Sequence, residues 1–394
     1  MSVQVITETP VTADRLPWRP LLVLSAAAFA SVTAEMLPAS LLVEIGDGLH
    51  VSASAAGLLV AAWALTVAVA SVPLTKATRR VPRGVLLPLV LVVFAVAVAG
   101  TAVAPTYGWA LGARMVAAAA HGLFWSLLMP TTAALTPPRL TGRAISIVSA
   151  GPTLAGIVGI PIGMVIGAAV GWRASFGILA AVLVAAAVAV RALKLPDAPA
   201  PGPRTGRGNR AVLAVTVGTG TLLIGHFLIY TYISPLLEPH YASGVRAALL
   251  LVFGLGGLAG TAAAGPLSDR FPRQALGWSA AVFAAALALL VFLSSGLVVA
   301  GVVLAFWGAL IGLIPPVFQT RLMRVATPGQ ETAAGAIAVT VLNAGIAAGA
   351  VVGGVVVGQW GTGTLPAIGT AFAALAAVLL VGRGLRSADG ADSH

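Results

Sequence analysis

Four ionisable side chains lie inside the long apolar runs of this sequence: Glu35, Arg114, His121 and His226. Burial favours the neutral form of a carboxyl group, whereas a neighbouring guanidinium favours its charged form. A glutamate beside an arginine can therefore take up a proton and release it when either group, or a substrate, moves. We predict that Glu35, the only acid within such a run, forms a proton-coupling site with Arg114. The alternatives are a static ion pair that joins two helices, with Arg114 in a structural role, and direct contact of Glu35 with substrate.

His121 follows Arg114 by seven residues, which is two turns of a helix, so the two side chains share one face. Trp125 lies one turn further along the same helix. We predict that this face lines a central cavity, in which Trp125 contacts substrate and His121 relays protons or binds substrate. The alternative for His121 is a neutral histidine that is hydrogen-bonded between helices.

A second polar segment contains His226, Tyr230 and Tyr232. We predict that these rings contact substrate in the same cavity; the alternative is anchoring at a membrane boundary, where tyrosine is common. Further predicted cavity residues are Trp307, Gln319 and Asn343.

The composition indicates which elements must carry these residues. Of the 394 residues 59% are hydrophobic and 8% are charged, against about 25% charged in soluble domains. The mean hydropathy is +1.02. These values exclude a cytosolic enzyme, a nucleic-acid binder and a disordered chain. The absence of cysteine excludes disulfides, Fe–S clusters and cysteine-ligated zinc. We therefore expect an all-α membrane protein with neither a metal nor a cofactor.

At about 20 residues per span, the chain has room for twelve transmembrane helices. The apolar runs place them at 20–42, 53–74, 84–104, 109–134, 144–168, 175–193, 211–236, 246–266, 275–294, 297–318, 333–357 and 363–382. Runs of this length exclude the alternating pattern of a β-barrel. Glu35 and Arg114 would both lie roughly 8–11 Å below the outer boundary, at 1.5 Å per residue.

The basic residues predict the orientation of these spans. Nineteen of the 22 Lys and Arg residues lie in segments on one side, two lie on the other side, and Arg114 lies within a span. The positive-inside rule then places both termini in the cytoplasm. The net charge of +11 is thus a signal of orientation rather than of nucleic-acid binding. The first 19 residues lack the pattern of a signal peptide, so we expect the first span to remain as an anchor.

Repeated sequence segments indicate that the chain consists of two pseudo-symmetric six-helix bundles. Arg80-Val81-Pro82-Arg83 and Arg270-Phe271-Pro272-Arg273 are 190 residues apart, and the glycine stripes 159/163/167 and 345/349/353 are 186 apart. Glycines spaced by four let another helix approach closely, and paired repeats around a midplane site are typical of secondary transporters. The predicted segments are a tail at 1–19, a bundle at 20–193, a polar linker at 194–210, a bundle at 211–385 and a tail at 386–394.

One further cluster follows the eighth predicted span. Asp269 is close in sequence to Arg270 and Arg273, and an acid with two cations can form a charge latch and cap a helix end. The corresponding position of the first half is Arg79, so that half lacks the acid.

Several of these stretches resemble the major facilitator superfamily, and most of all its twelve-helix drug/proton antiporter branch, which includes bacterial sugar and arabinose-type efflux permeases. The stretches are Thr33-Ala34-Glu35-Met36-Leu37-Pro38, Arg114 with His121-Gly122, Gly151-Pro152 with Gly159-Ile160-Pro161-Ile162-Gly163, Trp172-Arg173, Gly225-His226-Phe227 with Tyr230-Thr231-Tyr232-Ile233-Ser234-Pro235, and Asn343 with its glycine stripe. The segment 75–83 departs from the family's motif because it lacks the acid. The resemblance implies the major facilitator fold, a helix 1 acid that couples protons with support from the helix 4 arginine, and Gly151, Pro152, Gly159, Pro161 and Gly163 as conformational motifs.

We therefore expect a monomeric exporter in the inner membrane that exchanges a small amphipathic or drug-like solute for protons. Its partners would be the solute, protons and the lipid bilayer. A sugar or nucleoside exporter is the alternative within transport, although the predicted spans hold few Asn, Gln and Asp residues for a polar solute. A membrane sensor without transport is a more distant alternative. An enzyme is not expected, because the sequence offers no HExxH motif, no cysteine and only one acid within a span.

Overall fold

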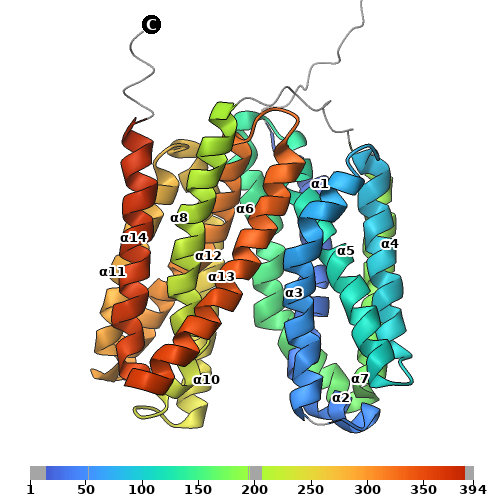
Figure 1. The fold of residues 1–394 in the computed structure, drawn as a ribbon, viewed down its shortest axis with the longest axis horizontal. Helices are drawn as coiled ribbons and strands as arrows, with labels where there is room; N and C mark the ends of the chain where they lie inside the picture. The colour runs from blue at the N-terminus through green and yellow to red at the C-terminus, as the bar shows by residue number, and fades with distance from the viewer. Residues whose placement is uncertain (1–14, 52, 194, 196–205, 387–394) are drawn as a thin grey trace, which may run out of the picture.

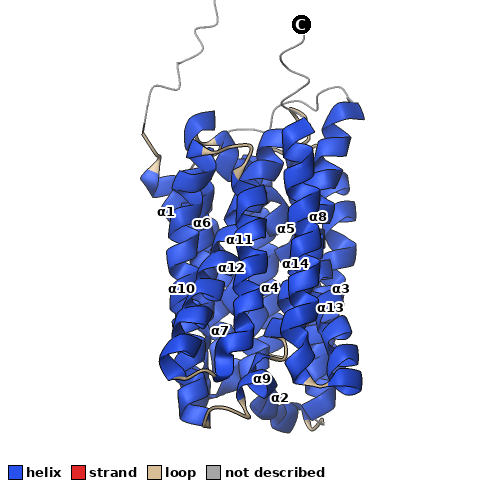
Figure 2. Ribbon diagram, turned by 90° about the vertical axis from the view of Figure 1, so that its left-hand side faces the viewer, coloured by secondary structure: helices blue, strands red, loops and turns tan. Residues whose placement is uncertain are grey.

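The structure is a computed structural model that describes residues 15–51, 53–193, 195 and 206–386. Every regular element within these residues is a helix, and the long helices run side by side in one bundle (Figures 1 and 2). Ten helices of the described chain are long and apolar enough to cross a membrane. The chain is therefore a multi-pass helical protein, as its composition predicts, while the count of twelve spans stays a prediction.

The described part of the first half, as predicted from sequence, begins at α1. Its elements are α1 (Trp18–Ser40), α2 (Leu42–Leu49), α3 (Ala53–Ala77), α4 (Arg83–Ala102), α5 (Tyr107–Ala134), the 3-10 turn η1 (Pro138–Leu140), α6 (Thr141–Leu154), the π-helical segment η2 (Ala155–Gly159) and α7 (Ile160–Ala192). A break inside α7 falls at Gly171, whose φ of 83° and ψ of 158° lie outside the helical region. Residues that carry a side chain rarely adopt this φ, so the glycine allows the backbone to turn here. The predicted gap between spans 144–168 and 175–193 contains this residue.

The second half continues from the linker. Its elements are α8 (Gly206–Tyr230), α9 (Ile233–Leu237), α10 (Ser243–Arg270), α11 (Ala275–Ala288), the 3-10 turn η3 (Leu289–Ser294), α12 (Leu297–Val325), α13 (Glu331–Trp360), the 3-10 turn η4 (Thr362–Thr364) and α14 (Leu365–Arg386). The predicted linker at 194–210 lies largely outside the described residues, and its last five residues belong to α8. Most of both predicted tails, at 1–14 and 387–394, also lies outside the described part.

The two glycine stripes have matching places in the packing. Gly159 and Gly163 lie against α1, where an added Cβ would come within 2.5 Å of Thr33 and of Leu37. Gly345 and Gly349 lie against α8 in the same way, with Leu223 and Phe227 at 2.7 Å. Each stripe therefore packs against the first long helix of its own half.

Helices α10 and α12 pack in direct backbone contact. A Cβ on Gly256 or Gly260 would overlap the carbonyl groups of α12, and a Cβ on Gly308 or Gly312 would overlap those of α10. Small residues at such a contact allow the two backbones to touch. These four glycines form a glycine seam at the middle of α10 and α12.

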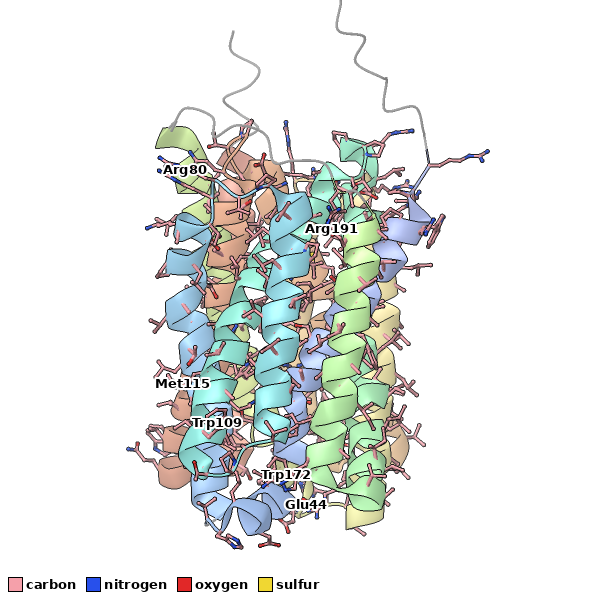
Figure 3. All side chains as sticks on the ribbon, turned by 90° about the vertical axis from the view of Figure 1, so that its right-hand side faces the viewer. Glu44, Arg80, Trp109, Met115, Trp172 and Arg191 are labelled. Carbon is pink, nitrogen blue, oxygen red and sulfur yellow. The ribbon has the colours of Figure 1, made fainter. Side chains whose placement is uncertain are left out.

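Each half packs mainly within itself, as Figure 1 shows. One hydrophobic cluster includes Phe94 and Phe124 and extends across the interface to Phe318, and a second cluster, which includes Phe283 and Trp307, lies within the second half. The halves meet where α6 contacts α10 and where α13 contacts α3 and α5. Arg80 and Arg191 lie at one end of the bundle, whereas Glu44 and Trp172 lie at the opposite end (Figure 3).

Candidate functional site

A cavity of about 290 Å³ lies between the two halves. Helices α1, α5 and α6 form one wall, and α8, α10, α12 and α13 form the other. The lining residues that the sequence singled out are Glu35, His121, Trp125, Pro152, Gln319 and Asn343. Most other lining side chains are apolar, such as Met129, Phe227 and Met323.

Glu35 stands at the edge of this cavity with His121 beside it. Its side chain is 17% exposed, and its Oε2 lies 3.5 Å from Nε2 of His121. The other ring nitrogen of His121, Nδ1, lies 2.9 Å from Oγ of Ser31, which is fully buried. Ser31 precedes Glu35 by one helical turn, so both residues face α5 from α1. A Ser–His–Glu chain of polar groups therefore ends at the cavity.

Aromatic rings enclose the imidazole of His121. Trp63, Phe94 and Trp125 have ring centroids 5.2, 5.9 and 6.1 Å from it. These rings come from α3, α4 and α5. Within the described residues, the polar contacts of the His121 ring are the hydrogen bond with Ser31 and the ion-pair contact with Glu35.

Arg114 is fully buried, and it bonds to the backbone of α1 rather than to the Glu35 carboxylate. Its Nη1 donates to the Ala34 carbonyl at 2.8 Å and its Nη2 donates to the Glu35 carbonyl at 3.2 Å. Pro38 has no N–H, so the Ala34 carbonyl lacks the usual partner four residues later. Arg114 supplies the missing donor, and its guanidinium lies 4.0 Å from the centre of the Trp63 ring.

His226, Tyr230 and Trp307 lie outside this cavity. His226 stacks on Tyr230 with a centroid distance of 5.3 Å, and Trp307 is 5.4 Å from His226. The faces of α8 and α12 that carry these rings turn toward Phe253 of α10, which lies 5.0 Å from Trp307. Tyr232 donates from its hydroxyl to the Ala350 carbonyl of α13 at 3.2 Å. The sequence predicts polar aromatic residues on α8 but not this direction of the helix face.

This second aromatic cluster occupies the positions that correspond to the surroundings of Glu35. The matched pairs, 186 to 191 residues apart, are Glu35 and His226, Trp63 and Phe253, Phe94 and Phe283, and His121 and Trp307. Each set comes from the first four long helices of its half. The first half thus combines an acid with a histidine, whereas the second half holds one histidine among aromatic rings.

The end of the bundle that carries Arg80 and Arg191 joins the halves through Asp269. Its carboxylate accepts from the backbone N–H groups of Gly142 and Arg143 at 2.8 and 3.1 Å, and from Arg324 at 2.8 Å. The expected sequence neighbours do not supply these contacts: Arg270 lies 5.6 Å over the Phe271 ring, and Arg273 is exposed. Asp269 caps the start of α6 in the other half, which requires the tertiary fold and cannot be read from local sequence.

Arg83 makes a second contact between the halves at this end. It is buried, and its Nη2 donates to Oγ1 of Thr332 at the start of α13, at 2.8 Å. From the sequence, this arginine was singled out only as part of the repeated segment Arg80–Arg83. The available signal was the echo of Arg80–Arg83 in Arg270–Arg273, because Arg83 and Asp269, which directly precedes the second segment, both contact the opposite half.

The Gly/Pro stretch of the fifth predicted span lies between α1 and the cavity. A Cβ on Gly151 would overlap the Ser25 carbonyl, and Pro152 lines the cavity. The next five residues after α6 form η2, a π-helical turn of the kind found frequently at functional sites. Pro161 follows in α7, but its side chain lies outside the described residues.

Such a site can exchange a proton between Glu35 and whatever fills the cavity. Within the described residues, no group of three or more His, Cys, Asp or Glu side chains gathers at one place.

Comparison with known proteins places this geometry among transporters. Residues 24–329 match the model of the Major Facilitator Superfamily. Two chloramphenicol efflux pumps of Mycobacterium tuberculosis, from strains CDC 1551 and H37Rv, are 35% identical over 377 residues, which is 88% of this chain and 89% of each pump.

Solved structures share the fold at low sequence identity. The human organic anion transporter MFSD10 (TETRAN) has a TM-score of 0.77 at 15% identity, covering 93% of this chain and 100% of its own. The E. coli fucose:proton symporter FucP has a TM-score of 0.75 at 16% identity, covering 92% of this chain and 98% of its own.

Proposed function

Because the chain belongs to the Major Facilitator Superfamily, we propose that it is a proton-coupled secondary transporter that exports a small amphipathic or drug-like solute. The observation that carries the proposal is the cavity between the halves, which has one carboxylate, Glu35, in its wall. An acid in an apolar wall is expensive unless it serves a partner or a pathway. Protons are the proposed coupling ion, and no cofactor is required.

The lining of the cavity supports an amphipathic solute. Apolar side chains make up most of it, and the described lining residues include no lysine or arginine that would hold an anion. Amide and hydroxyl groups are available at Gln319, Asn343 and Ser149. The relatives named as chloramphenicol efflux pumps support the same class, since chloramphenicol is a neutral aromatic compound with hydroxyl and amide groups. A sugar or nucleoside would need more polar groups than this wall offers, and it remains the alternative.

We propose that the cavity opens alternately to the two sides of the membrane, as the contacts between the halves break and re-form. Twelve spans are proposed, with the two segments 141–170 and 171–192 crossing separately on either side of Gly171. The end with Arg80, Arg191 and the Asp269 contacts is proposed to face the cytoplasm, by the positive-inside rule, in the inner membrane of the cell. Breaking the contacts of Asp269 and Arg83 opens the cavity to that side, and re-forming them closes it. The protein is proposed to act as a monomer.

Efflux in proteoliposomes tests this function. Purified protein is reconstituted into proteoliposomes with a pH gradient. Uptake of chloramphenicol, arabinose and uridine is measured, and a dye reports proton movement in parallel. We expect proton-driven flux of chloramphenicol, and loss of that flux in Glu35→Gln. Glu44→Gln is the matched control, because Glu44 is exposed on α2 at the end opposite the Asp269 contacts. Normal proton-driven export by Glu35→Gln would contradict the coupling role, and the absence of any flux would favour a sensor.

A further inference from the structure

We propose that the solute is recognised through an amide group, which pairs with one face of α12. Ile311, Pro315 and Gln319 form this face, because they are spaced by four residues and all line the cavity. The proposal rests on the proposed function, since it names the group by which the transported solute is held. The Gln319 side chain and the Ile311 carbonyl are then specificity determinants, in the wall opposite the one that carries Glu35.

The side-chain amide of Gln319 makes no hydrogen bond with the described residues. Gln319 is 5% exposed, and its Oε1 is buried without a partner. Asn343, the other amide side chain in the described cavity lining, differs because its Nδ2 donates to the Val339 carbonyl at 2.9 Å. An unpaired buried amide costs free energy. The terminal torsion of glutamine is broad, so either amide atom of Gln319 can turn toward a solute.

Two consecutive prolines of α12 deprive backbone carbonyls of their usual donors. Pro316 has no N–H, so the Gly312 carbonyl lacks the bond from four residues later. Oγ1 of Thr261 lies 3.0 Å from this carbonyl and donates to it instead. Pro315 leaves the Ile311 carbonyl in the same position, but no side chain of the described residues donates to that carbonyl. The Ile311 carbonyl is therefore an acceptor in the cavity wall.

These two groups have the polarity that an amide requires. Helix carbonyls point toward the C-terminus, whereas side chains lean toward the N-terminus. The Ile311 carbonyl and the Gln319 amide therefore extend toward each other along the face. A solute amide carries one N–H donor and one carbonyl acceptor. Its N–H donates to the Ile311 carbonyl, and its oxygen accepts from Nε2 of Gln319.

The rest of the lining specifies the body that carries this amide. Leu223, Phe227, Leu342 and Ile346 line the same cavity from α8 and α13. A site that hydrogen-bonds one group of a ligand discriminates strongly against analogues that lack this group, because its own polar atoms are then left unpaired. The solute class is thus a neutral amide on an apolar body, in which hydroxyl groups are dispensable.

Binding of chloramphenicol to the purified protein in detergent tests the amide directly, since this compound has one secondary amide. The Kd is measured with tritiated chloramphenicol, and two analogues are measured by competition. One analogue is methylated on the amide nitrogen, and the other is acetylated on the primary hydroxyl. We expect N-methylation to weaken binding to the wild type by about 2- to 12-fold, the size of one neutral hydrogen bond. O-acetylation should change the Kd by less than about twofold.

Two variants locate the partners of the amide. Pro315→Ala restores an N–H that donates to the Ile311 carbonyl, and Gln319→Met removes the side-chain amide while keeping an unbranched chain. Each should weaken chloramphenicol binding by about 2- to 12-fold. N-methylation should then cost less than about twofold in Pro315→Ala and keep its full cost in Gln319→Met. The matched controls are Pro88→Ala, inside α4, and Gln274→Met, at an exposed position before α11, both outside the cavity.

Unfolding of the solute-free protein in SDS separates recognition from a structural role. Gln319→Met removes an unpaired buried amide, so this variant should unfold at a higher SDS fraction than the wild type. An amide that supports the fold would have the opposite effect. Unfolding of Gln319→Met at a lower SDS fraction, or failure of this variant to fold, would overturn the inference.

The outcomes of binding and transport are independent of each other. Absence of proton-driven export in proteoliposomes contradicts the proposed function, whatever binds in detergent. The inference is overturned if the wild type binds no chloramphenicol, or if Gln319→Met binds it as tightly as the wild type. An equal cost of N-methylation in the wild type and in Pro315→Ala would overturn it as well, because the Ile311 carbonyl would then not be the acceptor.

Discussion

Arg114 and Pro38 are expected to be energetically coupled, because the proline leaves a carbonyl without a donor and the arginine supplies one. Proline has no N–H, so the Ala34 carbonyl has no donor four residues later in α1. Arg114 donates to that carbonyl at 2.8 Å, and separately to the Glu35 carbonyl at 3.2 Å. Replacement of Arg114 by methionine leaves an unbranched side chain of similar length and removes both hydrogen-bond donors.

The expected size follows from these two bonds. A hydrogen bond from a charged donor contributes about 1.5–3 kcal/mol to stability, although pairs measured inside membranes reach only about 1.7 kcal/mol. Arg114→Met should therefore lower the free energy of unfolding by roughly 2–4 kcal/mol. In a Pro38→Ala background, the backbone regains an N–H at this position, which can donate to the Ala34 carbonyl. The cost of Arg114→Met should then fall by about 1–2 kcal/mol.

A double-mutant cycle measures this difference. The wild type, both single variants and the double variant are unfolded reversibly in mixed micelles with increasing SDS, and tryptophan fluorescence reports the transition. Pro38→Ala alone should be neutral or slightly stabilising, because it supplies an N–H to a helix. If the two changes add within about 0.3–0.5 kcal/mol, Arg114 does not substitute for the missing N–H, and our explanation of its bonds to the α1 backbone is refuted.

Two further expectations concern contacts away from the cavity. Asp269→Asn weakens the carboxylate's bonds to the N–H of Gly142 and to Arg324; we expect about fivefold more opening at that end, equivalent to about 1 kcal/mol. Labelling of a single cysteine introduced into the cavity of this cysteine-free chain measures the opening, and an unchanged rate would contradict a latch. Gly260→Ala should destabilise the protein by about 1–3 kcal/mol, because its Cβ would overlap the backbone of α12. The matched variant Gly257→Ala should be neutral or stabilising, because the nearest atom to its Cβ is 3.6 Å away. Equal stabilities of these two variants in the SDS assay would exclude backbone contact between the helices.

The lengths of the apolar runs predict the positions of the helices, because the membrane imposes a minimum length on each run. The run at 84–104 corresponds closely to α4, and the gap before 175–193 contains the turn at Gly171. The π-helical turn at 155–159, where Gly159 lies against α1, was not predicted. Local composition carries little information about such a change in hydrogen-bond register.

The candidate site was only partly predictable, for a similar reason. Equal depth in the membrane places Glu35 near Arg114, and a spacing of seven places His121 on the same face. Depth and spacing do not reveal which atoms meet, so the bonds from Arg114 to the α1 backbone and the contact between His121 and Ser31 required the structure. The rotation of α8 about its axis was equally invisible, and it decides that His226 faces Trp307 rather than the cavity.

The glycine seam holds α10 and α12 together as a rigid pair of helices. Side chains between two helices can change conformation and so let the helices shift. Two backbones in direct contact cannot adjust in this way. Across the interface, α6 contacts both helices, and the π-helical turn η2 that follows α6 contacts α10. When the two halves rock against each other, we therefore expect the helix deformation to occur in the π-helical turn η2. Helices α10 and α12 are expected to move together as one rigid unit.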